Sequence, residues 1–279
     1  MAGTLYLCPT PIGNLGDITD RVLSTLNEVD LIAAEDTRNS MKLMNAFDIH
    51  VPMTSYHEFN KIDKAYTLIE KLREGKNIAL ISDAGTPGIS DPGEVLVKMC
   101  QEEGIPVTSL PGPCACIVAL TLSGMSTRRF CFEGFLPQEK NEKKDVLEEL
   151  KNESRTIVMY EAPHRLKETL KELRNALGED RKITICRELT KKFEEAIPLT
   201  LQGAIDYYEQ KDPRGEYVLV LEGISIKDKK ESIRKDWQEI SLEDHMEIYT
   251  SQGIDKKEAM KMVAKDRGIS KRDVYQALL

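Results

Sequence analysis

The sequence predicts an α/β protein, with α/β domains at residues 1–125 and 126–224 and a small helical domain at 225–279. Three observations lead to this prediction. In the first part, short apolar runs alternate with helical patterns, which is typical of a parallel sheet with helical crossovers. In the second part, strand patterns follow one another more closely, which indicates a mixed sheet. After Gly223 comes a polar segment, and beyond it only helical patterns remain.

The first domain is expected to contain five strands separated by helices. Apolar runs predict the strands at 4–8, 31–34, 53–56, 78–82 and 107–110. Helical patterns lie near 19–29, 38–47, 61–74, 92–103 and 113–123. Pro113 suits the first turn of the last of these helices, where a missing N–H costs nothing.

The second domain is expected to begin with a strand around 130–135. The polar segment that follows, at 136–144, resembles a linker between domains. Further strands are expected at 155–160, 182–187, 193–200 and 216–222, and helices at 141–152, 163–177 and 202–210.

The tail is expected to form three short helices at 242–250, 256–266 and 271–279. Ser270 is well placed to cap the last of them. The last two helices resemble a helix-turn-helix unit, although such units also serve simple packing.

The composition excludes several classes of protein. The 279 residues carry a formal net charge of −8, which argues against broad, sequence-independent binding to nucleic acid. No apolar run approaches the roughly eighteen residues of a membrane span, so no membrane partner is expected. The N-terminus lacks the basic and apolar regions of a signal peptide, so we expect a cytoplasmic protein. Six cysteines without zinc spacing predict no metal site.

The most distinctive stretch is the loop at 82–93, Ser-Asp-Ala-Gly-Thr-Pro-Gly-Ile-Ser-Asp-Pro-Gly, which follows an apolar run. Its glycines allow close approach of a ligand, and its prolines fix the shape of the loop. It is not a Walker phosphate loop, because Glu94 stands where a lysine should follow and Pro92 lacks an amide donor. Its acidic side chains suit hydroxyl groups or a cation better than a triphosphate. A rigid turn without any ligand is the alternative.

Other predicted strands also end in unusual sequences. The first strand leads into the loop at 9–17, the second into Glu-Asp-Thr-Arg at 35–38, and the fifth into Pro-Gly-Pro-Cys-Ala-Cys at 111–116. The carboxyl ends of parallel strands meet at one edge, where open α/β sheets bind small ligands. The sequence therefore predicts a ligand cleft at this edge.

Two further groups of residues have both a functional and a structural explanation. His57, after the third strand, and His164 are candidate general bases. His57 is the better candidate, because His164 beside Pro163 suits a role at the start of a helix or on the surface. Between residues 254 and 272, seven basic residues outnumber three acidic ones, which suits either contact with a polyanion or a solvated helix face.

Several of these motifs occur together in one family. The family's motifs lie here at 9–15, 35–38, 82–93, 111–114, 133–137, 164–165 and 187–191. With them the chain resembles the RsmI family of bacterial 16S ribosomal RNA cytidine 2′-O-methyltransferases, which has the tetrapyrrole-methylase fold. The resemblance runs from residue 4 to about 223 and continues more loosely into the tail. Cys8 stands where the family pattern would have a small aliphatic residue.

The resemblance implies methyl transfer from S-adenosylmethionine to the 2′-hydroxyl of a cytidine in 16S ribosomal RNA of the small subunit. It also implies a homodimer, with the methyl donor bound in a cleft between the two α/β domains. Carried onto this sequence, the donor pocket comprises Asp83, Ala84, Gly85, Thr86, Cys114, Ala115, Cys116, Tyr160, Glu161, Leu189, Gly215 and Glu216.

The residues that face the acceptor are less determined. The candidates for a general base near the ribose hydroxyl are Glu35, Asp36 and His57. The residues expected to contact RNA are Asn14, Arg38, Lys256, Lys257, Lys261, Lys271 and Arg272. Asp17 suits either the substrate entrance or the cap of the helix at 19–29.

Three alternatives stay open at this point. A tetrapyrrole or diphthine methyltransferase would share the donor loop, although the cluster at 35–38 and the helical tail favour RNA. A ribosome-associated binding protein without activity would rely on the basic tail. A nucleotide hydrolase would use 88–93 as a phosphate loop, which Glu94 and Pro92 disfavour.

Overall fold

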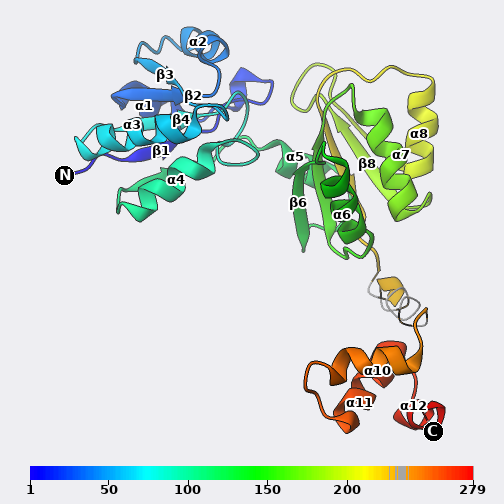
Figure 1. Ribbon diagram of the computed structural model, residues 1–279. Coiled ribbons are helices and arrows are strands. Elements are labelled where there is room, and N and C mark those ends of the chain that lie inside the picture. The colour runs from blue at the N-terminus through cyan, green and yellow to red at the C-terminus, as the bar shows by residue number, and fades with distance from the viewer. Residues whose placement is uncertain (226, 230, 232–236, 238, 279) are drawn as a thin grey trace.

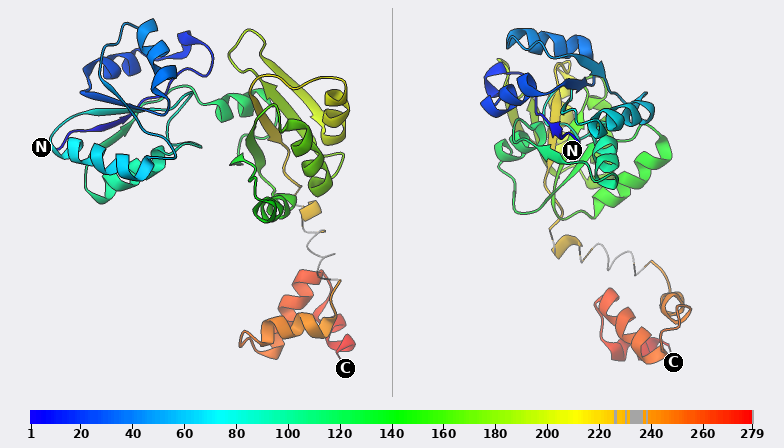
Figure 2. Two further views of the ribbon diagram at one scale, coloured as in Figure 1. Left: turned by 45° about the horizontal axis from the view of Figure 1, so that its top comes forward. Right: turned by 90° about the vertical axis from the view of Figure 1, so that its left-hand side faces the viewer.

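The computed structural model describes residues 1–225, 227–229, 231, 237 and 239–278. It contains two α/β units and a helical bundle that follows the second unit (Figure 1). Further views show the bundle standing apart from both sheets (Figure 2). In the described part of the chain, no helix is long and apolar enough to cross a membrane.

The first sheet is entirely parallel, as the alternation of strands and helices predicts. Its strands are β1 (Leu5–Leu7), β2 (Leu31–Ala34), β3 (Met53–Ser55), β4 (Ile78–Ile81) and β5 (Val107–Ser109), in the order β3-β2-β4-β1-β5. Every pair of neighbours in this order runs parallel. The carboxyl ends of all five strands therefore lie at the same edge.

Helices cover both faces of the first sheet. They are α1 (Asp20–Glu28), α2 (Thr37–Ala46), α3 (Lys61–Arg73) and α4 (Gly93–Glu102), with a short 3-10 helix η1 (Leu15–Asp17) in the first loop. Residues of α3 and α4 pack on one face with Leu5 and Leu80, and residues of α1 and α2 pack on the other with Ile32 and Ile81. Burial on both faces explains why these strands read as continuous apolar runs.

The start of α1 corrects one expectation. The Thr19 side chain accepts a hydrogen bond from the Val22 amide and caps the helix. Asp17 lies in η1, before this cap. The capping explanation for Asp17 is therefore wrong, because threonine is itself a good cap and stands one position before the first helical residue.

The second sheet is mixed, as predicted. Its strands are β6 (Phe130–Phe135), β7 (Thr156–Glu161), β8 (Lys182–Arg187), β9 (Glu195–Thr200) and β10 (Tyr217–Leu221), in the order β6-β7-β10-β8-β9. Only β6 and β7 pair in parallel, and the other neighbours are antiparallel. Helices α6 (Lys140–Lys151), α7 (Leu166–Leu177) and α8 (Leu201–Glu209) contribute to the core on one face.

Helix α5 (Ala115–Leu122) connects the two units. It follows β5 of the first sheet, but Cys116, Ala119 and Leu120 pack on the second sheet against Val158 and Val220. Figure 1 shows α5 beside the second sheet. The division at 1–125, 126–224 and 225–279 stays a prediction, and α5 is the element of the first segment that packs with the second.

The polar segment at 136–144 is not a linker between domains. It connects β6 to α6, and both belong to the second unit. Leu136 is 2% exposed, and Val146 of α6 packs against the same core. The linker prediction was wrong because polar residues mark an exposed loop and helix start as readily as a boundary between domains.

The tail forms the three expected helices, α10 (Leu242–Thr250), α11 (Lys256–Arg267) and α12 (Lys271–Ala277). Their small core contains Met246, Val263 and Val274. Ser270 caps α12 through a capping box with Asp273, as predicted. Gly268 ends α11 with φ 66°, a conformation that favours glycine.

Candidate active site

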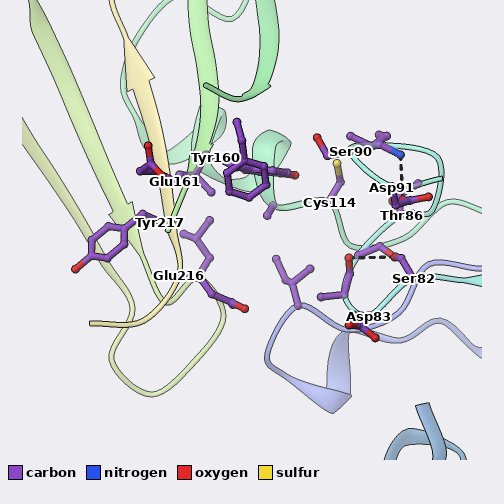
Figure 3. A pocket seen from close by; sticks show the side chains of 18 of the residues that line it. Ser82, Asp83, Thr86, Ser90, Asp91, Cys114, Tyr160, Glu161, Glu216 and Tyr217 are labelled. Atoms are coloured by element: carbon purple, nitrogen blue, oxygen red, sulfur yellow. Dashed lines mark hydrogen bonds between the residues drawn. The ribbon is translucent and has the colours of Figure 1, made fainter. Parts of the chain in front are cut away.

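A cavity of about 380 Å³ lies between the two sheets, at the carboxyl ends of the first sheet's strands. From the first unit and its connection come Ile12, Glu35, Ser82, Asp83, Ala84, Gly85, Thr86, Ile89, Ser90, Asp91, Cys114 and Ala115. From the second come Phe135, Tyr160, Glu161, Ala162, Pro163, Leu189, Glu216, Tyr217 and Val218. Figure 3 shows Tyr160 and Glu216 facing Asp83 and Cys114 across it.

The loop after β4 is held in place by its neighbours on both sides. The amide of Thr10 donates to the Gly85 carbonyl at 2.9 Å, and the Gly85 amide donates back at 3.0 Å. The Thr86 hydroxyl donates to the Pro113 carbonyl at 2.8 Å, so the loop is also tied to the segment after β5. Gly85 has φ 81°, which a residue with a Cβ adopts with strain. Three strand ends thus form one rigid wall.

The second half of this loop folds around a side chain of its own. The Asp91 carboxylate accepts hydrogen bonds from the amides of Gly88 and Gly93, at distances from 2.8 to 2.9 Å. These are amides that a Walker-type loop would offer to a phosphate. Because Asp91 already occupies them with a negative charge, the loop cannot hold a triphosphate in this way.

Two carboxylates lie where β2 and β4 end. The Asp83 amide donates to Glu35 at 3.3 Å. Burial raises the pKa of Glu35 above its ordinary value, with the charges of Asp83 and Asp91 acting in the same direction and the Asp83 amide opposing. Burial likewise raises the pKa of Asp83. Both groups therefore hold a proton more readily than free carboxylates do.

Asp36 and His57 lie outside the cavity lining. Asp36 caps α2, and its carboxylate accepts three hydrogen bonds from Arg38, through the amide, Nε and Nη2. These bonds lower the pKa of Asp36 to about 2. The His57 amide donates to Asn60 at 2.8 Å, so this residue belongs to the turn before α3. Of the three predicted bases, only Glu35 lines the cavity.

Glu161 has a structural function in the wall. Glu161 is 3% exposed, and one of its carboxylate oxygens accepts a hydrogen bond from the Ala162 amide at 2.7 Å. The other oxygen accepts from the Thr169 hydroxyl, and Arg165 Nε lies 3.6 Å from the first oxygen. The carboxylate thus has three partners within the second unit, and it fixes the turn from β7 into α7 at the edge of the cavity.

Lys191, Glu188 and Glu216 form a cluster that we call the Lys191 clamp, and it adjoins the cavity through Glu216. Lys191 Nζ lies 2.9 Å from Glu188 Oε1 and 2.8 Å from Glu216 Oε2. The stem of Lys191 packs against Gly13 so closely that a Cβ there would lie 2.4 Å from Cγ. Gly215 approaches Glu188 in the same manner. The clamp therefore joins the first loop of one sheet to two strand ends of the other.

The loop of the clamp is strained. Glu188 and Thr190 have φ values of 51° and 64°, which residues with a Cβ adopt at a cost. The Thr190 hydroxyl is buried without a hydrogen-bond partner. Strain of this kind concentrates at ligand sites, where the surrounding contacts maintain it.

Cys114 lies at the N-terminus of α5, with its sulfur 3.3 Å from that of Cys116. The hydrogen bond from the Cys116 thiol lowers the pKa of Cys114 to about 6. The same interaction, together with burial, raises the pKa of Cys116. Cys114 borders the cavity, and Cys116 packs into the core.

Ten of the twelve predicted donor residues line the cavity, and Cys116 and Gly215 lie behind it. Sequence reasoning missed Ile12, Ser82, Ile89, Ser90, Asp91, Phe135, Ala162, Pro163, Tyr217 and Val218 as lining residues. Several of them stand inside the motifs already singled out, so position within a motif was the available signal. Tyr217 and Val218 belong to an apolar strand, and nothing in its sequence indicated that they line a cavity.

The residues expected to contact RNA lie in two separate places. Asn14 caps η1 by accepting from the Gly16 amide, and the Arg38 side chain is 89% exposed at the start of α2. In the tail, Lys256, Lys257, Lys261 and Arg272 are exposed and Lys271 is half-buried. Arg267 instead donates to the carbonyls of Ile240 and Ser241 inside the bundle.

The fold resembles several solved methyltransferases. Diphthine synthase superimposes with a TM-score of 0.64 at 13% identity, covering 84% of this chain and 95% of that one. Cobalt precorrin-4 methyltransferase superimposes with a TM-score of 0.57 at 18% identity, covering 78% and 94%. At these identities the likeness concerns the fold alone.

Sequence comparison gives a closer relationship. Residues 4–204 match the family of tetrapyrrole (corrin/porphyrin) methylases. Ribosomal RNA small subunit methyltransferase I of Bacillus subtilis is 49% identical, over 99% of this chain and 94% of the relative. The proteins of that name from Halalkalibacterium halodurans and Synechocystis are 48% and 46% identical, over 98% and 99% of this chain and 93% and 98% of theirs. The chain therefore belongs to the tetrapyrrole methylases and, among them, to the methyltransferases of the ribosomal RNA small subunit methyltransferase I family.

Proposed function

We propose that this chain transfers the methyl group of S-adenosylmethionine to the 2′-hydroxyl of a cytidine in 16S ribosomal RNA of the small subunit. The observation that carries the proposal is the cavity at the carboxyl ends of the parallel strands, in a chain of this family. The names of the relatives support RNA of the small subunit as the substrate. The cytidine and the 2′-oxygen rest on the motif resemblance.

The lining of the cavity fits this methyl donor. Apolar side chains such as Ile12, Leu189 and Val218 suit the faces of adenine, and the Asp83 and Glu216 carboxylates suit ribose hydroxyls and an ammonium group. Among the lining residues there is no lysine or arginine, which agrees with a cationic ligand that has no phosphate. When bound, S-adenosylmethionine supplies an electrophilic methyl group on a positively charged sulfur.

Glu35 is the residue we propose as the general base. A ribose hydroxyl is a weak nucleophile until its proton is taken up by a nearby group. Glu35 lines the cavity, and its raised pKa suits proton uptake better than the low pKa of Asp36 does. Asp36 and Arg38 then hold each other at the start of α2, where the exposed guanidinium is available to an RNA phosphate.

The helical bundle supplies a second contact with RNA in this proposal. Its exposed lysines and Arg272 attract the phosphate backbone, which the acidic chain as a whole repels. We also propose that the enzyme is a cytoplasmic homodimer, as the family resemblance implies. Sedimentation velocity tests this assembly, and a single species with the mass of one chain would contradict it.

The decisive experiment incubates the protein with labelled S-adenosylmethionine and small ribosomal subunits from cells that lack the enzyme. Digestion to nucleosides should place the label in 2′-O-methylcytidine. Label on a base contradicts the proposed chemistry, and labelling of free RNA but not of subunits corrects the substrate form. Ala115→Trp, which fills the cavity, should abolish donor binding in calorimetry. Ile117→Trp on the same helix, 44% exposed and outside the lining, is the control and should retain it.

A further inference from the structure

A second, smaller cavity of about 210 Å³ adjoins the active-site cavity. Its lining comes from the first loop, from α2 and from the loop after β4, and consists of Thr10, Pro11, Gly13, Leu15, Leu43 and Asp83. Asp83 is the one residue that lines both cavities. Apart from Asp83, the residues of this cavity take no part in the binding of the methyl donor as proposed above.

The shared wall has a consequence for methyl transfer. The reacting oxygen and the methyl carbon must approach to about 3–3.5 Å before transfer, so donor and acceptor sites have to meet at a common residue. Asp83 is such a residue, and its amide bonds to Glu35 at 3.3 Å. A hydroxyl at this wall would lie beside the proposed base and in front of the donor.

The chemistry of the second cavity suits an uncharged nucleoside. Pro11, Leu15 and Leu43 provide apolar surface for the flat face of a base, and Asp83 provides oxygen acceptors for amino and hydroxyl groups. None of the lining residues is cationic, so the cavity does not attract a phosphate. The exposed guanidinium of Arg38 lies on the same helix as Leu43 and is available to a phosphate outside the cavity.

Building on the proposed function, we infer that the second cavity receives the acceptor nucleoside, with its 2′-hydroxyl against Asp83. In the transfer, the acceptor oxygen bonds to the methyl carbon while the carbon–sulfur bond of the donor breaks. The sulfur keeps that electron pair, and the hydroxyl proton passes to the Glu35 carboxylate. Asp83 orients the hydroxyl, and Leu43 and Leu15 contact the base.

The test fills the second cavity without touching the first. Leu43→Trp should leave the affinity for S-adenosylmethionine within about twofold of wild type, because Leu43 does not line the first cavity and mutations without shared contacts act independently. It should lower kcat/KM for small subunits by roughly tenfold to a hundredfold, because misplacement of the acceptor by about 1 Å has that effect. Met41→Trp, at a residue 48% exposed on the same helix and outside both linings, is the matched control.

Leu15→Trp is the second variant, because Leu15 is 51% exposed and its replacement does not disturb the core. The inference is overturned if both variants transfer methyl groups like Met41→Trp, or if they lose donor affinity together with transfer. Failure of the proposed function appears separately, as a wild-type protein that binds no S-adenosylmethionine or that methylates a base.

Discussion

Replacing Lys191 by methionine removes the charge of the clamp and keeps much of the side-chain length. Lys191 is 29% exposed and bonds at the same time to Glu188, which is 22% exposed, and to Glu216, which is 77% exposed. Glu216 lines the cavity, so the clamp decides where this carboxylate lies. We expect the variant to bind S-adenosylmethionine more weakly, although Lys191 itself does not line the cavity.

The geometry gives the size of the effect. Two carboxylate oxygens in contact with one nitrogen lie within about 6 Å of each other, and without the lysine they repel by about 0.7 kcal/mol in water or 3 kcal/mol at an effective dielectric constant of 20. The high exposure of Glu216 favours the lower end of this range, since solvent screens the pair. A loss of about 1 kcal/mol corresponds to roughly fivefold weaker binding.

Isothermal titration calorimetry with S-adenosylmethionine measures this loss. Lys192→Met is the matched control, because Lys192 is the neighbouring lysine. Its nitrogen lies 5.6 Å from the Phe193 ring centroid and forms no ion pair with a carboxylate of the described residues. A double-mutant cycle with Glu216→Gln should give a coupling energy near the single effect. If Lys191→Met and Lys192→Met bind the donor equally well, the clamp does not position Glu216 and the reasoning fails.

Four further predictions concern other parts of the molecule. The raised pKa of Glu35 means that methyl transfer should fall as the pH drops through a value above that of an ordinary glutamate, and Glu35→Gln should remove this step from the pH–rate profile. Iodoacetamide should alkylate Cys114 at a rate that rises as the pH passes about 6. S-adenosylmethionine should protect Cys114 from this modification. Equal modification with and without the donor would place the donor elsewhere. His245 is fully buried, and its pKa is lowered, chiefly by burial, so the unfolded bundle binds more protons than the folded one. The bundle should therefore lose stability below about pH 6.5, which the fluorescence of Trp237, stacked on His245, reports. His245→Gln should abolish this pH dependence. Replacing Lys256, Lys257 and Arg272 by glutamine should reduce the salt dependence of binding to small subunits without changing donor affinity.

The first sheet and its ligand edge could be predicted because parallel strands follow a simple rule. Buried strands read as apolar runs, and their carboxyl ends meet at one edge, so the loops at 9–17 and 82–93 had to lie together. The structure brings Thr10 and Gly85 into direct hydrogen bonding.

The functions of individual side chains could not be predicted in the same way. Glu161 stands at the end of a strand, like the other candidates, but Arg165 just before α7 and Thr169 in the first turns of α7 contact its carboxylate. Asp36 is next to Glu35 in sequence, yet it turns away to cap α2. The groups that each carboxylate contacts depend on its rotamer and on partners from the following helix. Hydrophobic periodicity and motif spacing give no information about either.

The boundary of the second unit shows a different limit. Composition separates exposed from buried segments, so it showed that 136–144 is polar. It did not show that this segment is a loop within one unit. The apolar character of α5 indicated burial without showing against which sheet. Which surfaces meet across units is decided by the tertiary fold, and a single sequence leaves that undetermined.

The Asp91 carboxylate in its ring of amides has a consequence for competition among ligands. Adenine nucleotides share their nucleoside with the proposed methyl donor and would compete for any pocket that recognises adenosine alone. The Gly88 and Gly93 amides, which could bind a phosphate, already bind the Asp91 carboxylate. Glu35 and Asp83 add further carboxyl groups to the wall of the cavity. The ionisable carboxyl groups of this lining have no lysine or arginine beside them in it, so the lining offers a triphosphate no positive side chain. For the proposed donor, we therefore expect discrimination between a cationic and an anionic adenosine derivative, because the loop itself carries the charge that repels the anionic one.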